Sequence, residues 1–244
     1  YGVILEARMG SSRLPGKTLM DICGEPLIKR VIDRIKCSRR IDKIVLATTS
    51  NAKDDILADY MNEIGVDVYR GSEENVLQRV VFAAEEFLIE NIIELHGDNP
   101  FLDSSIIDTA IEQYEETQCD YISNTIEKTY PMGLRVQVFT TESLRYIYDT
   151  VNDDAVNEHV SLYYYENPDV YHIENLIASE NIHRPEIRLT VDTEEDFQFV
   201  SEIYSIIIEN NLYPNFKTTD VLNIIDKQKI PLVNKNIKSK PVRY

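Results

Sequence analysis

Three cationic side chains follow the first apolar run of the chain, within the segment GVILEARMGSSRLPGK at residues 2–17. Arg8, Arg13 and Lys17 bring two guanidiniums and one ammonium into a loop of mostly small residues. Backbone N–H groups in such a loop, together with these cations, can hold phosphate oxygens. We expect accessible N–H groups at four positions: Gly10, Ser11, Ser12 and Gly16. The loop therefore predicts a phosphate-binding site.

Common phosphate-loop patterns do not describe this segment. A Walker loop would need a glycine in place of Ser11, and the GxGxxG dinucleotide pattern is missing. The simplest alternative is a basic surface loop that turns at Pro15 and Gly16.

The distribution of charge favours anion binding over a plain surface loop. The chain has 25 Lys and Arg against 42 Asp and Glu, a net charge of −17. Residues 1–43 nevertheless hold ten cations against five acids, and residues 227–244 hold six against none. Cations gathered beside the first strand of an acidic protein favour a small anionic ligand there. The overall negative field excludes extended binding to nucleic acid or to an anionic membrane.

Two aspartates each follow an apolar run and could bind a hard cation. Asp98 lies in HGDNP at residues 96–100, where a glycine and a proline restrict the turn. Asp192 follows the run RLTV, and we interpret Thr193 and Asp196 as caps of the next helix. Carboxylates fixed at strand ends suit Mg²⁺, which prefers oxygen ligands. Asp103, in contrast, fits the N-cap of a helix.

The elements that must position these residues alternate between strand and helix. Apolar runs predict strands at 2–6, 43–48, 65–69 and 91–95, and helical spacing predicts helices at 25–37, 51–64, 73–90 and 104–116. This alternation predicts an α/β fold with a mainly parallel open sheet flanked by helices. Ligands bind such sheets beyond the carboxyl ends of the strands, where the cationic loop and Asp98 lie.

The pattern changes after residue 120. We expect strands at 120–123, 129–139, 170–174 and 186–191, and helices at 141–149, 157–165, 194–209 and 217–226. The alternation within 129–139 is typical of an antiparallel strand. We expect a single domain over residues 1–226, with an antiparallel extension at about 124–175, and a basic tail at 227–244.

The cysteines and the lack of long apolar runs bear on location. Cys23, Cys37 and Cys119 are isolated, which favours reduced thiols over a disulfide framework or a zinc site. No apolar run has membrane-spanning length. We expect a cytoplasmic protein.

Seven ordered motifs resemble one bacterial enzyme family. They are ARMGSSRLPGK at 7–17, GEPLI at 24–28, RGSEENVLQR at 70–79, HGDNPFLD at 96–103, YPMGL at 130–134, NEHV at 157–160 and RLTVDTEEDF at 188–197. Their order resembles the spore-coat polysaccharide biosynthesis cytidylyltransferases and, more distantly, the enzymes that make CMP-Kdo and CMP-sialic acid. The resemblance covers about residues 1–210. It implies a Rossmann-like nucleotidyltransferase fold, an antiparallel extension that builds a homodimer, and transfer of CMP from CTP with Mg²⁺ and release of pyrophosphate.

The resemblance also implies roles for individual residues. Asp98 and Asp192 match the metal aspartates, and Arg13, Lys17 and Asp98 match catalytic positions. The expected nucleotide site comprises Ala7, Arg8, Met9, Gly10, Ser11, Lys17, Thr48, Thr49, Gly71, Ser72 and Val76. The expected acceptor site comprises Tyr130, Arg135, Gln137, Glu158 and His159.

Departures from the family pattern concentrate at the acceptor end. Met132, Arg135 and Gln137 stand where three acidic residues are usual, while Glu6 and His96 replace a common glutamine and threonine. An arginine at position 135 predicts a small anionic acceptor, such as a sugar acid or a phosphorylated or phosphonylated molecule. Alternatively, Arg135 and Gln137 face a dimer partner or solvent.

Two other functions fit the same motifs. One is a guanylyl- or other nucleotidyltransferase that acts on a sugar phosphate, because sequence does not place the residues that contact the base. The other is a non-catalytic nucleotide-binding domain, which the presence of both metal aspartates and all three cations disfavours.

Overall fold

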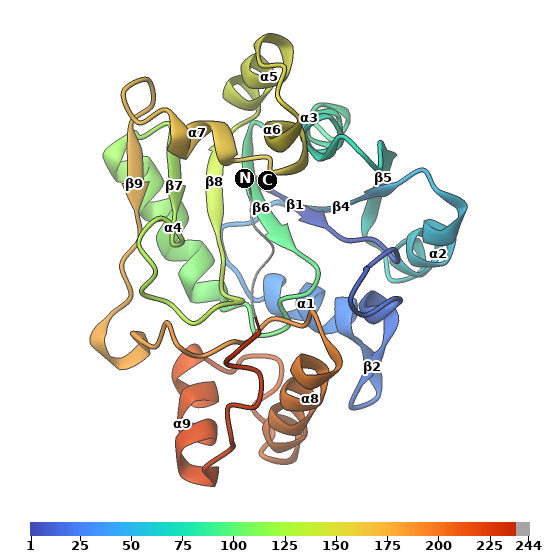
Figure 1. The fold of residues 1–244 in the computed structure, drawn as a ribbon, viewed down its shortest axis with the longest axis vertical. Coiled ribbons are helices and arrows are strands. Elements are labelled where there is room, and N and C mark those ends of the chain that lie inside the picture. Colours follow the sequence, from blue (N-terminus) through green and yellow to red (C-terminus); the bar gives the residue numbers. More distant parts are fainter. Residues whose placement is uncertain (238–244) are drawn as a thin grey trace.

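A computed structural model describes residues 1–237 of the chain. Within this range the strands form a seven-stranded sheet in the order β5-β4-β1-β6-β8-β7-β9 and a separate two-stranded hairpin (Figure 1). The main-sheet strands are β1 (Gly2–Glu6), β4 (Lys43–Thr49), β5 (Asp67–Gly71), β6 (Asn91–His96), β7 (Tyr121–Ser123), β8 (Gln137–Thr140) and β9 (Ile173–Asn175). The hairpin pairs β2 (Asp21–Ile22) with β3 (Glu25–Pro26).

Strands β1, β4, β5 and β6 are parallel, because a helix returns the chain between successive strands. Strand β8 runs antiparallel between β6 and β7, and β9 lies parallel to β7 at the edge. The prediction of a mainly parallel open sheet flanked by helices is confirmed. The antiparallel strand within residues 124–175 continues the main sheet.

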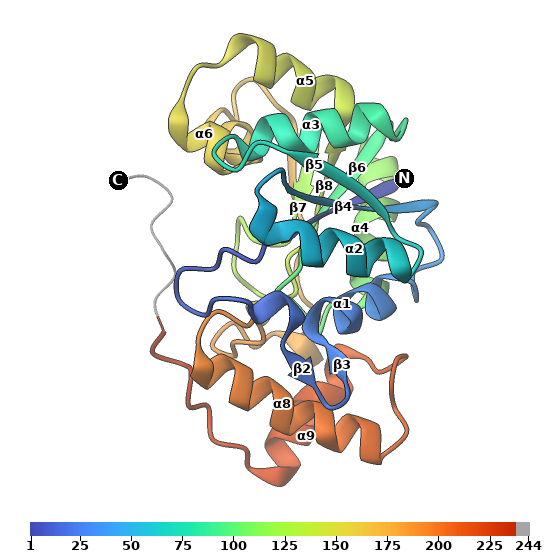
Figure 2. The same cartoon turned by 90° about the vertical axis from the view of Figure 1, so that its right-hand side faces the viewer.

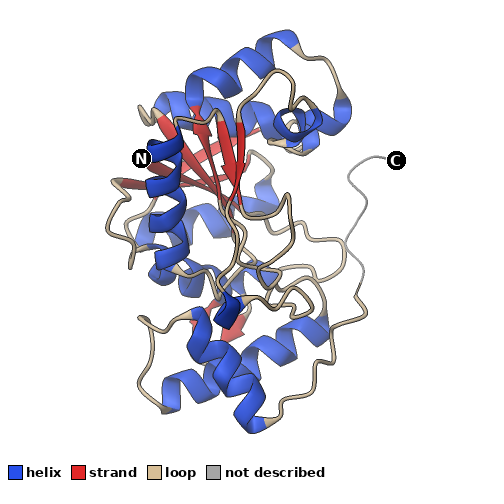
Figure 3. Ribbon diagram, turned by 90° about the vertical axis from the view of Figure 1, so that its left-hand side faces the viewer, coloured by secondary structure: helices blue, strands red, loops and turns tan. Residues whose placement is uncertain are grey.

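Helices cover both faces of the sheet (Figures 2 and 3). The described α-helices are α1 (Leu27–Ile35), α2 (Asp55–Glu63), α3 (Val76–Glu86), α4 (Ser104–Thr117), α5 (Thr141–Thr150), α6 (Asp154–Glu158), α7 (Leu162–Glu166), α8 (Glu194–Glu209) and α9 (Thr218–Gln228), and 3₁₀ turns span Lys17–Leu19, Ala52–Asp54 and Glu180–Ile182. Helices α3, α5, α6 and α7 pack on one face, and α1, α2 and α4 on the other, with α8 and α9 beyond them. Each face buries its own apolar cluster.

Every helix in the described part of the chain is too short or too polar to cross a membrane.

Several predicted elements differ from the structure. The helix predicted at 157–165 is wrong, because α6 ends at Glu158 and α7 begins at Leu162. Val160, Leu162 and Tyr164 are all buried, and this spacing of two cannot place three side chains on one face of a continuous helix.

The strands predicted at 129–139 and 186–191 form only in part. Residues 137–140 pair as β8, whereas Met132 and Arg188 make an isolated bridge. At Gly133 the backbone has φ +102°, and a Cβ there would lie 2.7 Å from the backbone of Leu189 and Thr190. This close approach bends the segment out of regular pairing and brings it against the chain that precedes Asp192.

Helix α9 ends at Gln228, so the predicted basic tail begins within it. Residues 230–237 pack back on the molecule, with Ile230 and Asn234 buried. The rest of the tail, residues 238–244, lies outside the described residues.

Candidate active site

The loop after β1 folds onto itself through its own backbone. The N–H groups of Ser11 and Gly16 both donate to the carbonyl of Met9, at 3.0 and 3.1 Å. Met9 in turn donates its N–H to Oδ1 of Asp54, at 2.6 Å. The N–H groups of Ser11 and Gly16 are therefore used within the loop, contrary to the expectation that they are accessible. The loop is held in one shape by Asp54, whose role sequence reasoning missed.

Lys17, at the end of this loop, lies between the two predicted metal aspartates. Its Nζ donates to Asp98 Oδ2 at 2.8 Å, to Asp192 Oδ1 at 3.0 Å and to the carbonyl of Val191 at 2.6 Å. Burial would lower the pKa of Lys17, but Asp98 and Asp192 outweigh it and raise that pKa above its usual value. Lys17 is therefore a fixed cation with three acceptors.

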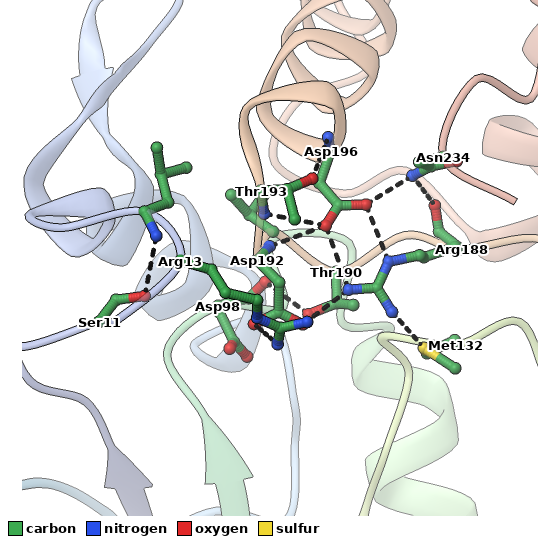
Figure 4. Close-up of polar contacts among 12 residues, drawn as sticks. Ser11, Arg13, Asp98, Met132, Arg188, Thr190, Asp192, Thr193, Asp196 and Asn234 are labelled. Carbon is green, nitrogen blue, oxygen red and sulfur yellow. Dashed lines mark hydrogen bonds and ion pairs between the residues drawn. The ribbon is translucent and has the colours of Figure 1, made fainter. Parts of the chain in front are cut away.

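Asp192 also contacts two guanidiniums (Figure 4). Arg13 Nη2 lies 2.9 Å from its Oδ1, and Arg188 Nη2 lies 2.6 Å from its Oδ2. Burial would raise the pKa of Asp192, but Lys17, Arg13 and Arg188 hold it below the usual range. The predicted catalytic and metal residues therefore lie together. They are Arg13, Lys17, Asp98 and Asp192.

Two backbone contacts bring Asp98 and Asp192 together although they are far apart in sequence. The carbonyl of Asp98 accepts the N–H of Val191 at 2.9 Å and the hydroxyl of Thr190 at 3.2 Å. Gly97 lets this turn lie against the loop after β1, because a Cβ at Gly97 would lie 2.7 Å from Ala7 Cβ. The turn after β6 therefore contacts both the loop after β1, at Ala7, and the segment before α8, at Val191.

Asp98 and Asp192 fit a shared divalent cation. Both carboxylates converge on one point that the Lys17 ammonium now occupies, which shows that a cation is accommodated between them. Within residues 1–237 no cluster of three or more His, Cys, Asp or Glu side chains could hold a metal alone. Hard cations in nucleotide enzymes take one or two carboxylates and complete their shell with phosphate and water oxygens. The pair fits a site that the substrate completes.

The predicted nucleotide residues gather at the carboxyl ends of β1, β4 and β5. Ala7 to Ser11 follow β1, Thr48 and Thr49 end β4, and Gly71 ends β5. Neighbouring parallel strands carry them to the same edge of the sheet. Thr48 and Thr49 are fully buried, and the Thr49 hydroxyl donates to Asp54. Thr49 therefore supports the loop after β1 through Asp54.

The remaining nucleotide candidates lie at the start of the next helix, whose N-cap is Asn75. Ser72 Oγ accepts the N–H of Asn75 at 2.9 Å, and α3 begins at Val76. Arg8 is not part of the group around Lys17. Its Nη1 lies 3.4 Å from Glu73 Oε1, in the loop between β5 and α3. The structure therefore places Arg8 apart from Arg13 and Lys17, on the side of β5 and α3.

A pocket of about 560 Å³ opens beside Asp98. Its lining includes two of the predicted acceptor residues, Tyr130 and Arg135, together with His96, Asn99, Lys128 and Tyr165. Arg135 donates from Nη2 to the buried Ser161 hydroxyl at 3.1 Å. Burial would lower the pKa of Arg135, but Glu94 and the other acidic groups around the guanidinium together outweigh burial, and the pKa of Arg135 is raised. The pocket therefore presents a cation to a ligand that sits next to Asp98.

The other three predicted acceptor residues do not line this pocket. Gln137 is fully buried on β8, where its side chain accepts the hydroxyl of Tyr121. Glu158 is exposed at the end of α6, and His159 begins the break that follows it. The expected helix would have carried both residues on its first turn, and its replacement by two short helices moves them away.

A buried acid lies behind the pocket. Glu94 on β6 is 2% exposed, and its Oε1 lies 3.7 Å from His96 Nε2. Burial and the neighbouring carboxylate of Glu6 raise the pKa of Glu94 well above its usual value, despite Arg135. Burial also lowers the pKa of His96, so this ring is neutral near pH 7. Glu94 is therefore a buried acid behind the pocket that holds its proton more tightly in the folded state than in the unfolded state.

We expect Glu94→Gln to stabilise the protein above neutral pH. The folded state binds a proton on Glu94 more tightly than the unfolded state does, so stability falls as pH rises from the unfolded pKa to the raised folded pKa. One proton gives a slope of at most about 1.4 kcal/mol per pH unit. Urea unfolding at several pH values from 5 to 9 measures this slope, which the variant should flatten. The exposed Glu90→Gln is the control, and an equal slope in wild type and Glu94→Gln would show that Glu94 titrates normally.

The chain is similar to known proteins over most of its length. It matches the cytidylyltransferase family over residues 2–228. An uncharacterized protein of Methanocaldococcus jannaschii is 32% identical over 244 residues, which cover 98% of this chain and 96% of that protein. The spore coat polysaccharide biosynthesis protein SpsF of Bacillus subtilis is 33% identical over 229 residues, covering 92% and 93% of the two chains.

Solved structures agree with these sequence similarities. A cytidylyltransferase from Leptospira borgpetersenii superposes with a TM-score of 0.89 at 28% identity, over 98% of both chains. A CMP:2-keto-3-deoxy-manno-octonic acid synthetase complexed with CTP shares the fold, with a TM-score of 0.61 at 16% identity over 85% of this chain and 98% of that one.

Proposed function

The chain belongs to the cytidylyltransferase family, and from that premise we propose that it transfers CMP from CTP to a small anionic acceptor and releases pyrophosphate. The resemblance found in the ordered motifs is confirmed, and the protein is a nucleotidyltransferase. We further propose that the product is a precursor of a surface polysaccharide or glycoconjugate, which the name of the Bacillus subtilis relative supports.

The observation that carries this proposal is the convergence of Lys17 and Asp192 on Asp98, which lines the pocket that contains Arg135. Asp98 and Asp192 would hold Mg²⁺, which supplies charge neutralisation for the phosphate oxygens when it is bound. Lys17 and Arg13 lie beside the same carboxylates and can donate to the departing pyrophosphate. No protein nucleophile is required, because an oxygen of the acceptor attacks the α-phosphorus in line.

Arg135 and Lys128 supply the anion preference of the pocket. Both line it, and Arg135 keeps its charge although it is largely enclosed. A guanidinium in this setting binds a carboxylate, phosphate or phosphonate more strongly than a neutral group. Arg135 Nη2 bonds to the buried Ser161, which holds the guanidinium at the pocket wall. The alternative that Arg135 faces solvent or a dimer partner stays a prediction, which the Arg135→Gln variant tests.

We expect pyrophosphate release to require CTP and an anionic acceptor. The test measures release with each of the four nucleoside triphosphates against a panel of sugar acids, sugar phosphates, phosphonates and neutral sugars. Arg135→Gln should raise the acceptor KM by roughly 10- to 150-fold, which corresponds to the about 1.5–3 kcal/mol of a charged hydrogen bond, and should leave the KM for CTP unchanged. Arg145→Gln removes an exposed cation on α5 and is the matched control.

An unchanged acceptor KM in Arg135→Gln, with lowered thermal stability alone, would show that Arg135 is structural. Release that depends on GTP or another nucleotide in place of CTP would contradict the proposed nucleotide. Homodimerisation through residues 124–175 and a cytoplasmic location stay predictions, for which light scattering and cell fractionation are the measurements.

A further inference from the structure

Asp196 is the centre of a buried network behind Asp192. Its side chain is fully buried, and its Oδ2 accepts the backbone N–H groups of Asp192 and Thr193 at 2.9 and 3.1 Å. The same residue closes the capping box of α8 with Thr193. Asp196 therefore does more than cap a helix, because it fixes the backbone turn on which Asp192 stands.

Arg188 joins Asp196 to the side chain of Asp192. Its Nε donates to Asp196 Oδ1 at 2.8 Å, and its Nη2 donates both to Asp196 Oδ2 at 3.1 Å and to Asp192 Oδ2 at 2.6 Å. Its Nη1 lies 2.7 Å from Met132 Sδ in the pocket wall (Figure 4). The planar guanidinium thus sets the orientation of Asp192 relative to Asp196.

Asn234 holds this network from the far side. Its Nδ2 donates to Asp196 Oδ1 at 2.8 Å and to the carbonyl of Arg188 at 3.1 Å. Asn234 is fully buried, whereas Val233 and Lys235 on either side are exposed. It lies beyond α9 and beyond residue 228, where the family match ends. One buried polar side chain in an otherwise exposed segment therefore reaches the support of Asp192.

We propose that Asn234 is a positioning residue that fixes Asp192 for cation binding through Arg188 and Asp196, which makes the segment after α9 part of the active site. This inference rests on the proposed function, in which Asp192 holds the divalent cation. Without the Nδ2 donor, two buried acceptors lose a hydrogen bond, and Asp196 and Arg188 are free to tilt. Asp192 Oδ2 is hydrogen-bonded to Arg188, so a tilt of Arg188 also turns the Asp192 carboxylate away from Asp98.

The test compares the cation dependence of Asn234→Ala with that of the wild type. Partners behind metal ligands typically contribute about 10- to 100-fold in metal affinity, so the Mg²⁺ concentration for half-maximal turnover should rise by that factor. Binding of Mn²⁺, measured by electron paramagnetic resonance with CTP present and no acceptor, should weaken by a similar factor. Arg188→Lys keeps the charge but loses the fork geometry, and should show the same shift if Asn234→Ala fails to fold.

Two control variants separate positioning from stability. Lys235→Ala changes the exposed neighbour, and Ile225→Val loosens the buried face of α9 without touching the network. Both should keep the wild-type cation dependence. If Asn234→Ala shows the same cation dependence as Ile225→Val and differs only in unfolding temperature, the inference is overturned. If Asp192→Asn also keeps wild-type cation dependence, the failure lies in the metal site of the proposed function.

Discussion

Asp98→Asn and Asp192→Asn are each expected to lower turnover by at least about 100-fold while the chain stays folded, in the range of losing one charged stabiliser of a transition state. Each change replaces a carboxylate by a neutral amide at the point where Lys17 now lies. An amide holds a hard cation weakly, and the charge that develops on the phosphate oxygens is then less well neutralised. Pyrophosphate release at saturating CTP and Mg²⁺ is the measurement.

Asp103→Asn is the matched control for both variants. Asp103 also follows β6, but it caps α4 and accepts the N–H and hydroxyl of Thr218. We expect this variant to lose stability and to keep its turnover. Near-normal Mg²⁺-dependent turnover in Asp98→Asn or Asp192→Asn would remove that residue from the site.

Much of the fold could be predicted from periodicity alone. Strands β1, β4 and β6 are mainly apolar, because both of their faces are buried. Helix α8 begins at Glu194 as predicted, since Thr193 and Asp196 form the expected capping box. The prediction failed where tertiary contacts override local pattern, as at Val160, Leu162 and Tyr164, whose alternating burial breaks the predicted helix in two.

The site was predictable in part for a topological reason. Lys17 follows β1 and Asp98 follows β6, and these are adjacent parallel strands whose carboxyl ends meet at one edge. Asp192 follows no strand of the sheet, and its place beside Asp98 depends on a backbone bond from Val191. Its position after the apolar run RLTV and the resemblance to a family both indicated Asp192, but neither showed the backbone contact that brings it beside Asp98.

Three supporting residues gave no signal that sequence reasoning could use. Arg188 lies in an apolar run that predicts a strand, where a charged residue is expected to face solvent. Asn234 lies in a polar, basic segment that offers no hydrophobic period to place it. Asp54 resembles an ordinary helix-start aspartate, yet it is fully buried beneath the loop after β1. Each acts through side-chain hydrogen bonds that depend on the folded structure, which a local sequence pattern does not record.

Lys17→Ala is expected to weaken catalysis with CTP by about 2–4 kcal/mol in kcat/KM, in the range of losing one donor to a developing charge in a dehydrated site. It should also reduce inhibition by added pyrophosphate, because the ammonium that binds the leaving group is gone. Steady-state kinetics with CTP and with pyrophosphate as inhibitor measure both effects. The exposed Lys53→Ala, which loses an ion pair to Glu73, is the control.

The same variant should enlarge the stabilising effect of the divalent cation. In the wild type Lys17 neutralises Asp98 and Asp192, so added Mg²⁺ must compete with an ammonium that is already bound between them. In Lys17→Ala the two partly buried carboxylates lie close together without that cation, which destabilises the fold. Mg²⁺ should then bind the folded state more tightly and raise the unfolding temperature more than it does in the wild type, without any nucleotide. An equal rise in both proteins would show that Lys17 and the divalent cation do not share one position.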